Sequence, residues 1–247
     1  RWPNAIWKDK SVFNNTYWAK SNKSSIRGMM VDDGSLGLAA SGLNMTGAMA
    51  VLNVGSYLTS VKRGLWHNPK DNNFTYEDDF GKTKWKPWIN QYYLDSKLDL
   101  LDNPGEWFYD PNTKTLYFYP PDNVHPSDLE IKGKSIDYAF KLTKSNHIRI
   151  KNINFFGTTI SSKESTHLSI ENCEFKYPSF NKRMIGDLSS ISETKFLTRK
   201  KEDLANNKII NCTFEYADGV GLKMTGKKIT VENNYIHDID FSCITGG

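Results

Sequence analysis

The chain contains the stretch Ile150-Lys151-Asn152-Ile153-Asn154-Phe155, and its pattern returns three times. The later copies are Ile170–Phe175, Ile209–Phe214 and, more loosely, Val231–Ile236, so the copies begin 20, 39 and 22 residues apart. A step of about 20 to 22 residues between short alternating strands is typical of one coil of a parallel β-solenoid. The 39-residue step then equals one coil plus an insertion, which we place at about residues 176–207.

Stacked coils predict columns of equivalent side chains, because neighbouring strands lie about 4.8 Å apart. The expected inward columns are Ile150, Ile170, Ile209 and Val231; Ile148, Leu168 and Ile229; and Phe155, Phe175, Phe214 and Ile236. The shared Asn of each copy is expected at a corner, since Asn tolerates bent backbone and stacked amides bond coil to coil. These residues are Asn152, Asn172, Asn211 and Asn233. Cys173 and Cys212 share one template position, which predicts neighbouring, buried free thiols.

Residues 1–130 have a different composition from the repeats. All seven Trp residues lie before residue 108, whereas the three Cys residues follow residue 145. The aromatic runs Glu106–Asp110 and Leu116–Pro120, joined by a turn-rich segment, predict a β-hairpin. Residues 28–60 are interrupted by glycines and keep no helical period, which predicts short strands. We therefore expect little helix and two parts: a β-rich part, 1–130, packed on the solenoid, and coils over 131–247.

Composition excludes several classes of protein. The 247 residues are 38% hydrophobic and 24% charged, which indicates a globular chain and not a disordered or collagen-like one. The stretch Leu36–Gly55 is too often interrupted by polar residues to span a membrane. Three Cys residues without paired spacing argue against a disulfide scaffold or zinc module. A net charge of +4 without a recognised motif argues against nucleic-acid binding.

The repeated coils resemble those of the right-handed parallel β-helix superfamily, the pectin-lyase-like proteins. The run Asn233–Ile239, the predicted hairpin and the opening Arg1–Asn4 add to the resemblance, which extends to secreted bacterial proteins regarded as glycoside hydrolases. It implies an all-β fold, a right-handed parallel β-helix preceded by an irregular β-rich part. It also implies a polysaccharide substrate and a secreted, periplasmic or cell-surface location. Because such proteins stack more coils than the four legible here, we expect further repeats in a longer parent chain.

The strongest catalytic candidates lie near the last repeat. If Ile239 and Phe241 point inward, Asp238 and Asp240 share the outward face, with backbones roughly 6.5 to 7 Å apart. Such a pair suits an inverting glycoside hydrolase, and Asp218 has the same offset from its repeat as Asp240. We predict glycosidic hydrolysis with Asp218, Asp238 and Asp240 as candidate acids and His237 assisting.

Two alternatives stay open. The segment 176–207 carries a charge of +3, which suits a lyase acting on an acidic polysaccharide. In that reaction Lys182, Arg183 and Lys223, or a bound Ca²⁺, would neutralise a uronate, and His237 or Tyr177 would be the base. No cofactor is otherwise expected. The predicted substrate-binding residues are Tyr177, Lys182, Arg183 and Lys223.

The second alternative is a non-enzymatic extracellular structural or carbohydrate-binding module. In that case His237 and Asp238 form a corner and Asp218 is a turn residue before Gly219. Trp85 and Trp88 are further candidates for stacking on sugar rings.

Overall fold

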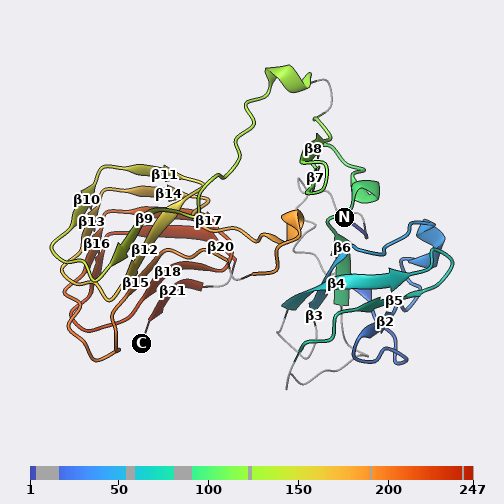
Figure 1. Ribbon diagram of the computed structural model, residues 1–247, viewed down its shortest axis with the longest axis horizontal. Helices are drawn as coiled ribbons and strands as arrows, with labels where there is room; N and C mark the ends of the chain where they lie inside the picture. Colours follow the sequence, from blue (N-terminus) through green and yellow to red (C-terminus); the bar gives the residue numbers. More distant parts are fainter. Residues whose placement is uncertain are drawn as a thin grey trace. The chain divides into compact units, whose positions relative to one another are not determined.

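A computed structural model describes residues 1–3, 17–53, 59–80, 91–121, 124–189, 191–240 and 242–246 (Figure 1). The expectations for Trp85, Trp88 and Phe241 fall outside these residues. The chain divides into two compact units, Arg1–Leu129 with Lys182–Leu188 and Glu130–Asn181 with Ser189–Gly247. Helix is confined, within the described ranges, to short 3₁₀ segments: η4 (Ala39–Ser41), η6 (Leu98–Leu100), η7 (Pro126–Asp128) and η8 (Arg183–Ile185). The predicted all-β class is confirmed.

The first unit is built on a curled antiparallel sheet of order β1-β6-β3-β4-β5-β2. Its strands are β1 (Ala19–Lys20), β2 (Met29–Val31), β3 (Met49–Asn53), β4 (Thr59–His67), β5 (Asn73–Tyr76) and β6 (Gln91–Asp95). Met30, Phe74 and Tyr92 are among the fully buried side chains of its core. The Tyr92 hydroxyl donates a 2.6 Å hydrogen bond to Asp32 Oδ2, so this core also contains a satisfied polar pair.

The predicted hairpin is present in the same unit. Strands β7 (Trp107–Asp110) and β8 (Thr115–Phe118) pair antiparallel, with Trp107 opposite Phe118 and Phe108 opposite Tyr117. Asp110 accepts a hydrogen bond from the Asn112 backbone N–H at 2.9 Å, which stabilises the connecting turn. The aromatic runs and the turn residues predicted this element from local chemistry alone.

The second unit is a parallel β-solenoid whose coils contribute to three sheets. The first sheet comprises β9 (Tyr138–Thr143), β12 (Thr159–Lys163), β15 (Lys195–Leu197), β18 (Val220–Met224) and β21 (Ser242–Gly246). The second comprises β10 (Arg149–Lys151), β13 (Ser169–Glu171), β16 (Lys208–Ile210) and β19 (Thr230–Glu232). The third comprises β11 (Asn154–Phe156), β14 (Glu174–Lys176), β17 (Thr213–Ala217) and β20 (Tyr235–Ile239). We call them the β9, β10 and β11 sheets.

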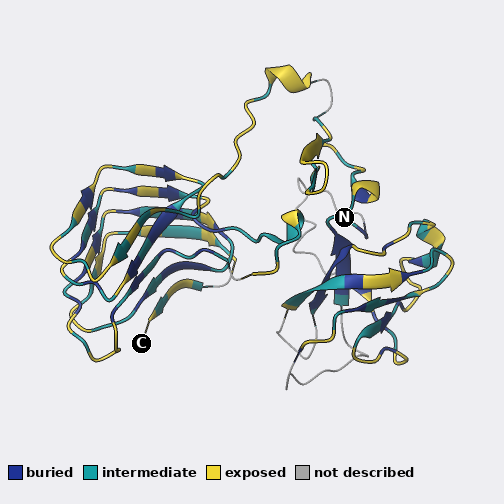
Figure 2. Cartoon of the chain, viewed as in Figure 1, coloured by how far each residue is buried: buried dark blue, intermediate teal, exposed yellow. Residues whose placement is uncertain are grey.

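The predicted columns match the strand register. Ile150, Ile170, Ile209 and Val231 are successive partners in the β10 sheet, and Phe155, Phe175, Phe214 and Ile236 are successive partners in the β11 sheet. The phenyl rings of Phe155, Phe175 and Phe214 stack with centroids 4.5 and 4.6 Å apart. Figure 2 shows buried and exposed residues alternating along these strands. Val231, on the edge strand β19, is the exception in its column at 38% exposed.

Left-handed residues form the corners of each coil. Asn152, Asn172, Asn211 and Asn233 have φ between 50° and 57°. The side-chain amide of Asn172 donates to Asn152 at 3.3 Å, and that of Asn233 donates to Asn211 at 2.7 Å. The predicted Asn ladder is therefore present between the β10 and β11 sheets. Asn211 is nevertheless exposed, so the ladder runs along the surface of the solenoid.

The insertion differs from the single segment expected at 176–207. The middle of this segment contains strand β15, which pairs with β12 and β18 as a regular strand of the β9 sheet. We call each such strand a rung of the solenoid. Strand β15 separates two loops, 177–194 before the rung and 198–207 after it, whereas equivalent connections such as 157–158 and 164–168 are short. Repeat matching missed β15 because the matched template covers strands of the β10 and β11 sheets, whereas β15 belongs to the β9 sheet.

Candidate functional site

The outer face of the β9 sheet gathers lysines from several coils. Lys141, Ser161, Lys195, Lys223 and Thr245 are successive register partners. They alternate with buried neighbours such as Ile160 and Leu222, which places them on the outward side. Lys141 is exposed and Lys195 is half-buried. We call Lys141, Lys195 and Lys223, with Tyr138 and Glu193 beside them, the lysine strip.

Contacts within the lysine strip leave it positively charged. Lys223 Nζ lies 3.1 Å from Glu193 Oε2, and the Lys223 side chain is still 43% exposed. The Nζ atoms of Lys141 and Lys195 each lie 5.6 Å from the centre of the Tyr138 ring, a cation–π arrangement that adds no negative charge. Three ammonium groups therefore face one carboxylate. Lys223 was predicted from sequence, whereas Lys141, Lys195, Tyr138 and Glu193 were missed because their alignment depends on the undetected rung β15.

A second group of charged residues lies on the outer face of the β11 sheet. Lys176, Glu215 and His237 are partners on successive strands. Lys176 Nζ lies 2.8 Å from Glu215 Oε1, and this hydrogen bond raises the pKa of Lys176. His237 Nε2 lies 3.4 Å from Glu215 Oε2, and its Nδ1 lies 2.8 Å from Asp238 Oδ2. We call Lys176, Glu215, His237 and Asp238 the His237 cluster.

The His237 cluster joins two predicted residues, His237 and Asp238, to two that sequence reasoning missed, Lys176 and Glu215. Each ring nitrogen of His237 lies beside a carboxylate oxygen, to which an imidazole N–H can donate a hydrogen bond. Glu215 follows Phe214 as His237 follows Ile236, and that shared offset was the available signal. The cluster can hold and exchange a proton. Because the imidazole occupies the space between Glu215 and Asp238, those two carboxylates do not form the open pair of a glycoside hydrolase.

Asp238 and Asp240 do not form the predicted i, i+2 pair on one flat strand. Asp238 has φ 53°, and Gly157, Tyr177 and Tyr216 occupy the same left-handed corner position in the other coils. A corner at Asp238 breaks the alternation of side chains on which that prediction depended. The Asp240 backbone N–H donates to the Ala217 carbonyl at 3.0 Å, so Asp240 and Asp218 do lie on neighbouring rungs, as predicted.

Asp218 anchors the loop that follows Tyr177. Its Oδ2 accepts the Asn181 backbone N–H at 2.5 Å, and its carbonyl accepts the Ser179 hydroxyl at 2.7 Å. Both bonds hold the start of the 177–194 loop. This geometry favours a structural role for Asp218.

The Tyr177 ring is part of a stack of aromatic side chains at the corner that follows the β11 sheet. It stacks on the ring of Tyr216 with centroids 5.1 Å apart. Rings stacked along the solenoid axis cover each other's faces, so they leave mainly edges and hydroxyls for a ligand. A sugar ring stacks on an aromatic face, which makes these two tyrosines poor stacking platforms.

Lys182 and Arg183 belong to the first compact unit. Arg183 Nε lies 2.9 Å from Asp95 Oδ2, and Arg183 also donates to the Tyr93 hydroxyl at 3.3 Å. Asp95 is buried, so Arg183 supplies the charge that this carboxylate requires. Lys182 Nζ lies 4.0 Å from Asp187. Arg183 is thus paired with a residue of the first unit. Lys223 belongs to the solenoid unit, so the predicted substrate-binding residues do not all lie in one unit.

Other features of the described residues bear on ligands and cofactors. No group of three or more His, Cys, Asp or Glu side chains among them is arranged to hold a metal ion. In the same residues no helix has the length and apolar character needed to cross a membrane. Cys173 and Cys212 are buried free thiols, as predicted, and burial raises the pKa of Cys212 to about 11.

Comparisons with protein-family models, with curated proteins and with solved structures find no match. The lysine strip and the His237 cluster are therefore the features of the chain from which its function is inferred.

Proposed function

We propose that the solenoid unit binds an acidic polysaccharide along the outer face of the β9 sheet. The observation that carries this proposal is the lysine strip, in which Lys141, Lys195 and Lys223 share one outward column and Glu193 supplies a single carboxylate among the described residues beside it. Rungs about 4.8 Å apart present ammonium groups along the solenoid axis. An extended polymer with carboxylate or sulfate groups matches such a line of charge. An extracellular or periplasmic location belongs to the same proposal.

The test is binding to an acidic and a neutral polysaccharide, polygalacturonate and a neutral glucan. Replacing Lys141, Lys195 and Lys223 together by Gln should weaken polygalacturonate binding by roughly 10- to 100-fold, since each surface charge pair contributes up to about 1 kcal/mol. Binding should also weaken with added salt, which screens exposed charges. Isothermal titration calorimetry at two ionic strengths measures both effects.

A matched triple variant controls for net charge. Lys151, Lys208 and Lys228 are exposed on the solenoid but lie outside the lysine strip. Their replacement by Gln changes the charge by the same amount and should leave binding within about twofold. Equal loss in both triple variants, or equal affinity for the neutral glucan, would refute the assigned face.

Cleavage of a glycosidic bond is the second candidate function, and the His237 cluster favours it. Histidine exchanges protons near neutral pH, and Glu215 and Asp238 orient both nitrogens of this one. In hydrolysis the charged imidazole would protonate the leaving glycosidic oxygen while water attacks the anomeric carbon and the bond between them breaks. In elimination the neutral imidazole would remove the proton beside a uronate carboxylate, and the C–O bond to the leaving glycosidic oxygen would break as a C=C bond forms.

Two readouts separate these reactions. New reducing ends without ultraviolet absorbance indicate hydrolysis, whereas absorbance of an unsaturated uronate indicates elimination. Loss of product in His237→Gln and Glu215→Gln supports the cluster, and loss in Asp240→Asn instead supports the acid predicted from sequence. Binding without cleavage of any acidic or neutral substrate leaves the carbohydrate-binding module as the function.

A further inference from the structure

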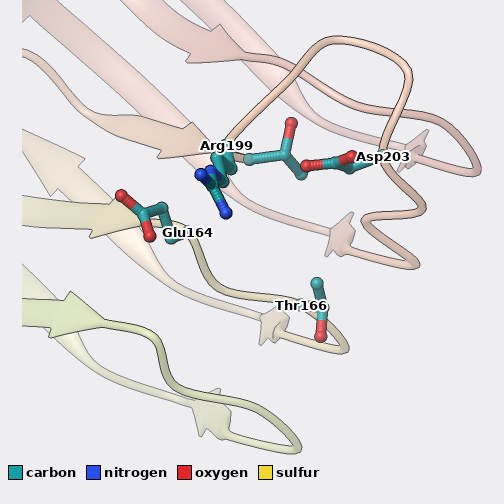
Figure 3. A pocket seen from close by; sticks show the side chains of 5 residues that line it. Glu164, Thr166, Arg199 and Asp203 are labelled. Carbon is teal, nitrogen blue, oxygen red and sulfur yellow. The ribbon is translucent and has the colours of Figure 1, made fainter.

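A small polar hollow lies where strands β12 and β15 end. It is lined by Glu164 and Thr166 from the turn after β12 and by Thr198, Arg199 and Asp203 from the loop after β15. Figure 3 shows Arg199 between Glu164 and Asp203. The hollow has a volume of about 180 Å³. This is below the roughly 300–1,000 Å³ of pockets for drug-sized ligands, so it suits one small unit.

The loop that forms one side of the hollow is held firmly. The Thr198 hydroxyl donates to the Lys200 carbonyl at 2.6 Å, and Asp203 Oδ2 accepts the Lys200 backbone N–H at 2.9 Å. Gly226, with φ 114°, packs so closely that a Cβ there would lie 2.7 Å from Thr198 Cγ2. A loop fixed by such contacts presents its polar groups without a large ordering cost on binding.

The lining favours a neutral ligand rich in hydroxyl groups. Glu164, Asp203 and Arg199 carry a combined charge of −1, and Lys163 Nζ lies 4.0 Å from Glu164 Oε1, so the hollow with its edge has no net charge to attract an anion. The Glu164 carboxylate can accept hydrogen bonds from a ligand, the Arg199 guanidinium can donate them and the Thr166 hydroxyl can do both, whereas the Thr198 hydroxyl and Asp203 Oδ2 already bond within the loop. Adjacent hydroxyls of a sugar ring both donate and accept hydrogen bonds, as these side chains require. A single uncharged sugar is a small ligand with this pattern.

The hollow is also near the lysine strip. Glu164 follows Ser161 by three positions, and Arg199 follows Lys195 by four. At about 3.3 Å per extended residue this places the hollow roughly 10–13 Å along the strands from the lysine column. A sugar in the hollow would therefore be a branch and not the next unit of a backbone bound along the column.

We propose that the hollow of Glu164, Thr166, Thr198, Arg199 and Asp203 binds a neutral sugar carried as a side branch of the acidic polysaccharide. The branch assignment rests on the proposed function, whereas the affinity of the hollow for a neutral sugar does not. The solenoid then distinguishes branched from unbranched acidic polymers.

The first test is titration of the whole chain with methyl glucoside, methyl galactoside and glucuronate, followed by amide chemical shifts in NMR spectra. One of the neutral glycosides should shift the resonances of Thr166, Thr198 and Arg199 at millimolar concentration. Arg199→Gln should weaken that binding at least fivefold. Lys201→Gln, an equal charge change at an exposed position of the same loop, should leave it unchanged.

Contrary results are equally specific. Shifts confined to other residues, no shift up to tens of millimolar, or tighter binding of glucuronate would overturn the proposal. If polygalacturonate still binds in that case, the proposed function stands without the branch site. If the neutral glycoside binds the hollow but the triple lysine variant binds polygalacturonate normally, the lysine strip assignment fails and the hollow stands.

The branch assignment has its own test, the affinity for branched and unbranched acidic polymers. The unmodified chain should prefer the branched polymer, and the Arg199→Gln variant should bind both polymers equally.

Discussion

At the scale of single residues, the corner asparagines combine two kinds of stabilisation. Asn172 adopts φ 51° and donates its side-chain amide to Asn152. A left-handed conformation costs most residues about 1–2 kcal/mol, and Asn tolerates it because of its short polar side chain. Asn is therefore favoured at each of these corners because it tolerates the left-handed backbone and because its side-chain amide bonds to the Asn of the next coil.

Replacing Asn172 should separate these two reasons. Asn172→Ala should lower the free energy of unfolding by about 1–2 kcal/mol, because it imposes strain and removes the amide bond. Asn172→Gly removes the bond without the strain and should be the more stable of the two variants. Urea unfolding of both variants measures the difference, and equal stability would argue against backbone strain as the cause.

The three cysteines should differ in reactivity. Cys173 and Cys212 are buried and Cys243 is exposed. Burial raises the pKa of Cys212 to about 11, so at pH 8 this thiol is almost entirely protonated and a poor nucleophile. Iodoacetamide at pH 8 should modify Cys243 in the native protein and reach Cys212 only after unfolding. Mass spectrometry of the peptides checks the order, and early modification of Cys212 would show that the solenoid interior opens readily.

At the scale of elements, the stacked phenylalanines connect successive coils of the β11 sheet. Phe175 is fully buried between Phe155 and Phe214, with rings nearly parallel to both. The Phe175 ring contacts a neighbouring phenyl ring on each of its two faces, so replacing it by a small side chain leaves a cavity in the middle of the stack.

Phe175→Ala should destabilise the solenoid unit by about 3–5 kcal/mol. Phe156→Ala removes the same side chain from the outer face, where it is 51% exposed, and should cost less than about 1 kcal/mol. Hydrogen exchange of the β11, β14 and β17 amides reports on this unit directly. Similar loss of protection in both variants would contradict the assignment of inward and outward positions.

At the scale of the whole molecule, the chain passes between its two compact units more than once. Lys182–Leu188 belongs to the first unit although residues on both sides belong to the solenoid unit. Arg183 secures this segment through Asp95, and Arg63 donates to the Gly186 carbonyl at 3.0 Å. Arg183, which was predicted from sequence to bind substrate, thus pairs with a buried carboxylate of the first unit.

Arg183→Met should destabilise the first unit by about 3 kcal/mol, because it removes the guanidinium that is ion-paired with the buried Asp95 carboxylate. Lys182→Met is the matched control, since its 4.0 Å contact with Asp187 should contribute less than about 1 kcal/mol. Hydrogen exchange in β6 and β3 should increase only in the Arg183 variant. Normal protection of β6 in that variant would show that the ion pair contributes little.

The sequence by itself determined the solenoid, its inward columns, the Asn corners, the buried thiols and the hairpin. Each of these depends on neighbours in the chain or on a repeat that stacks identical residues, so spacing carries the information. The tertiary structure alone decided which charged residues meet. Rung β15 aligns Lys195 with Lys223, the corner at Asp238 separates it from the flat strand, and Asp95 engages Arg183 from 88 positions away. Such pairings depend on register, corner geometry and long-range packing, because side chains distant in sequence interact only after the coils have stacked.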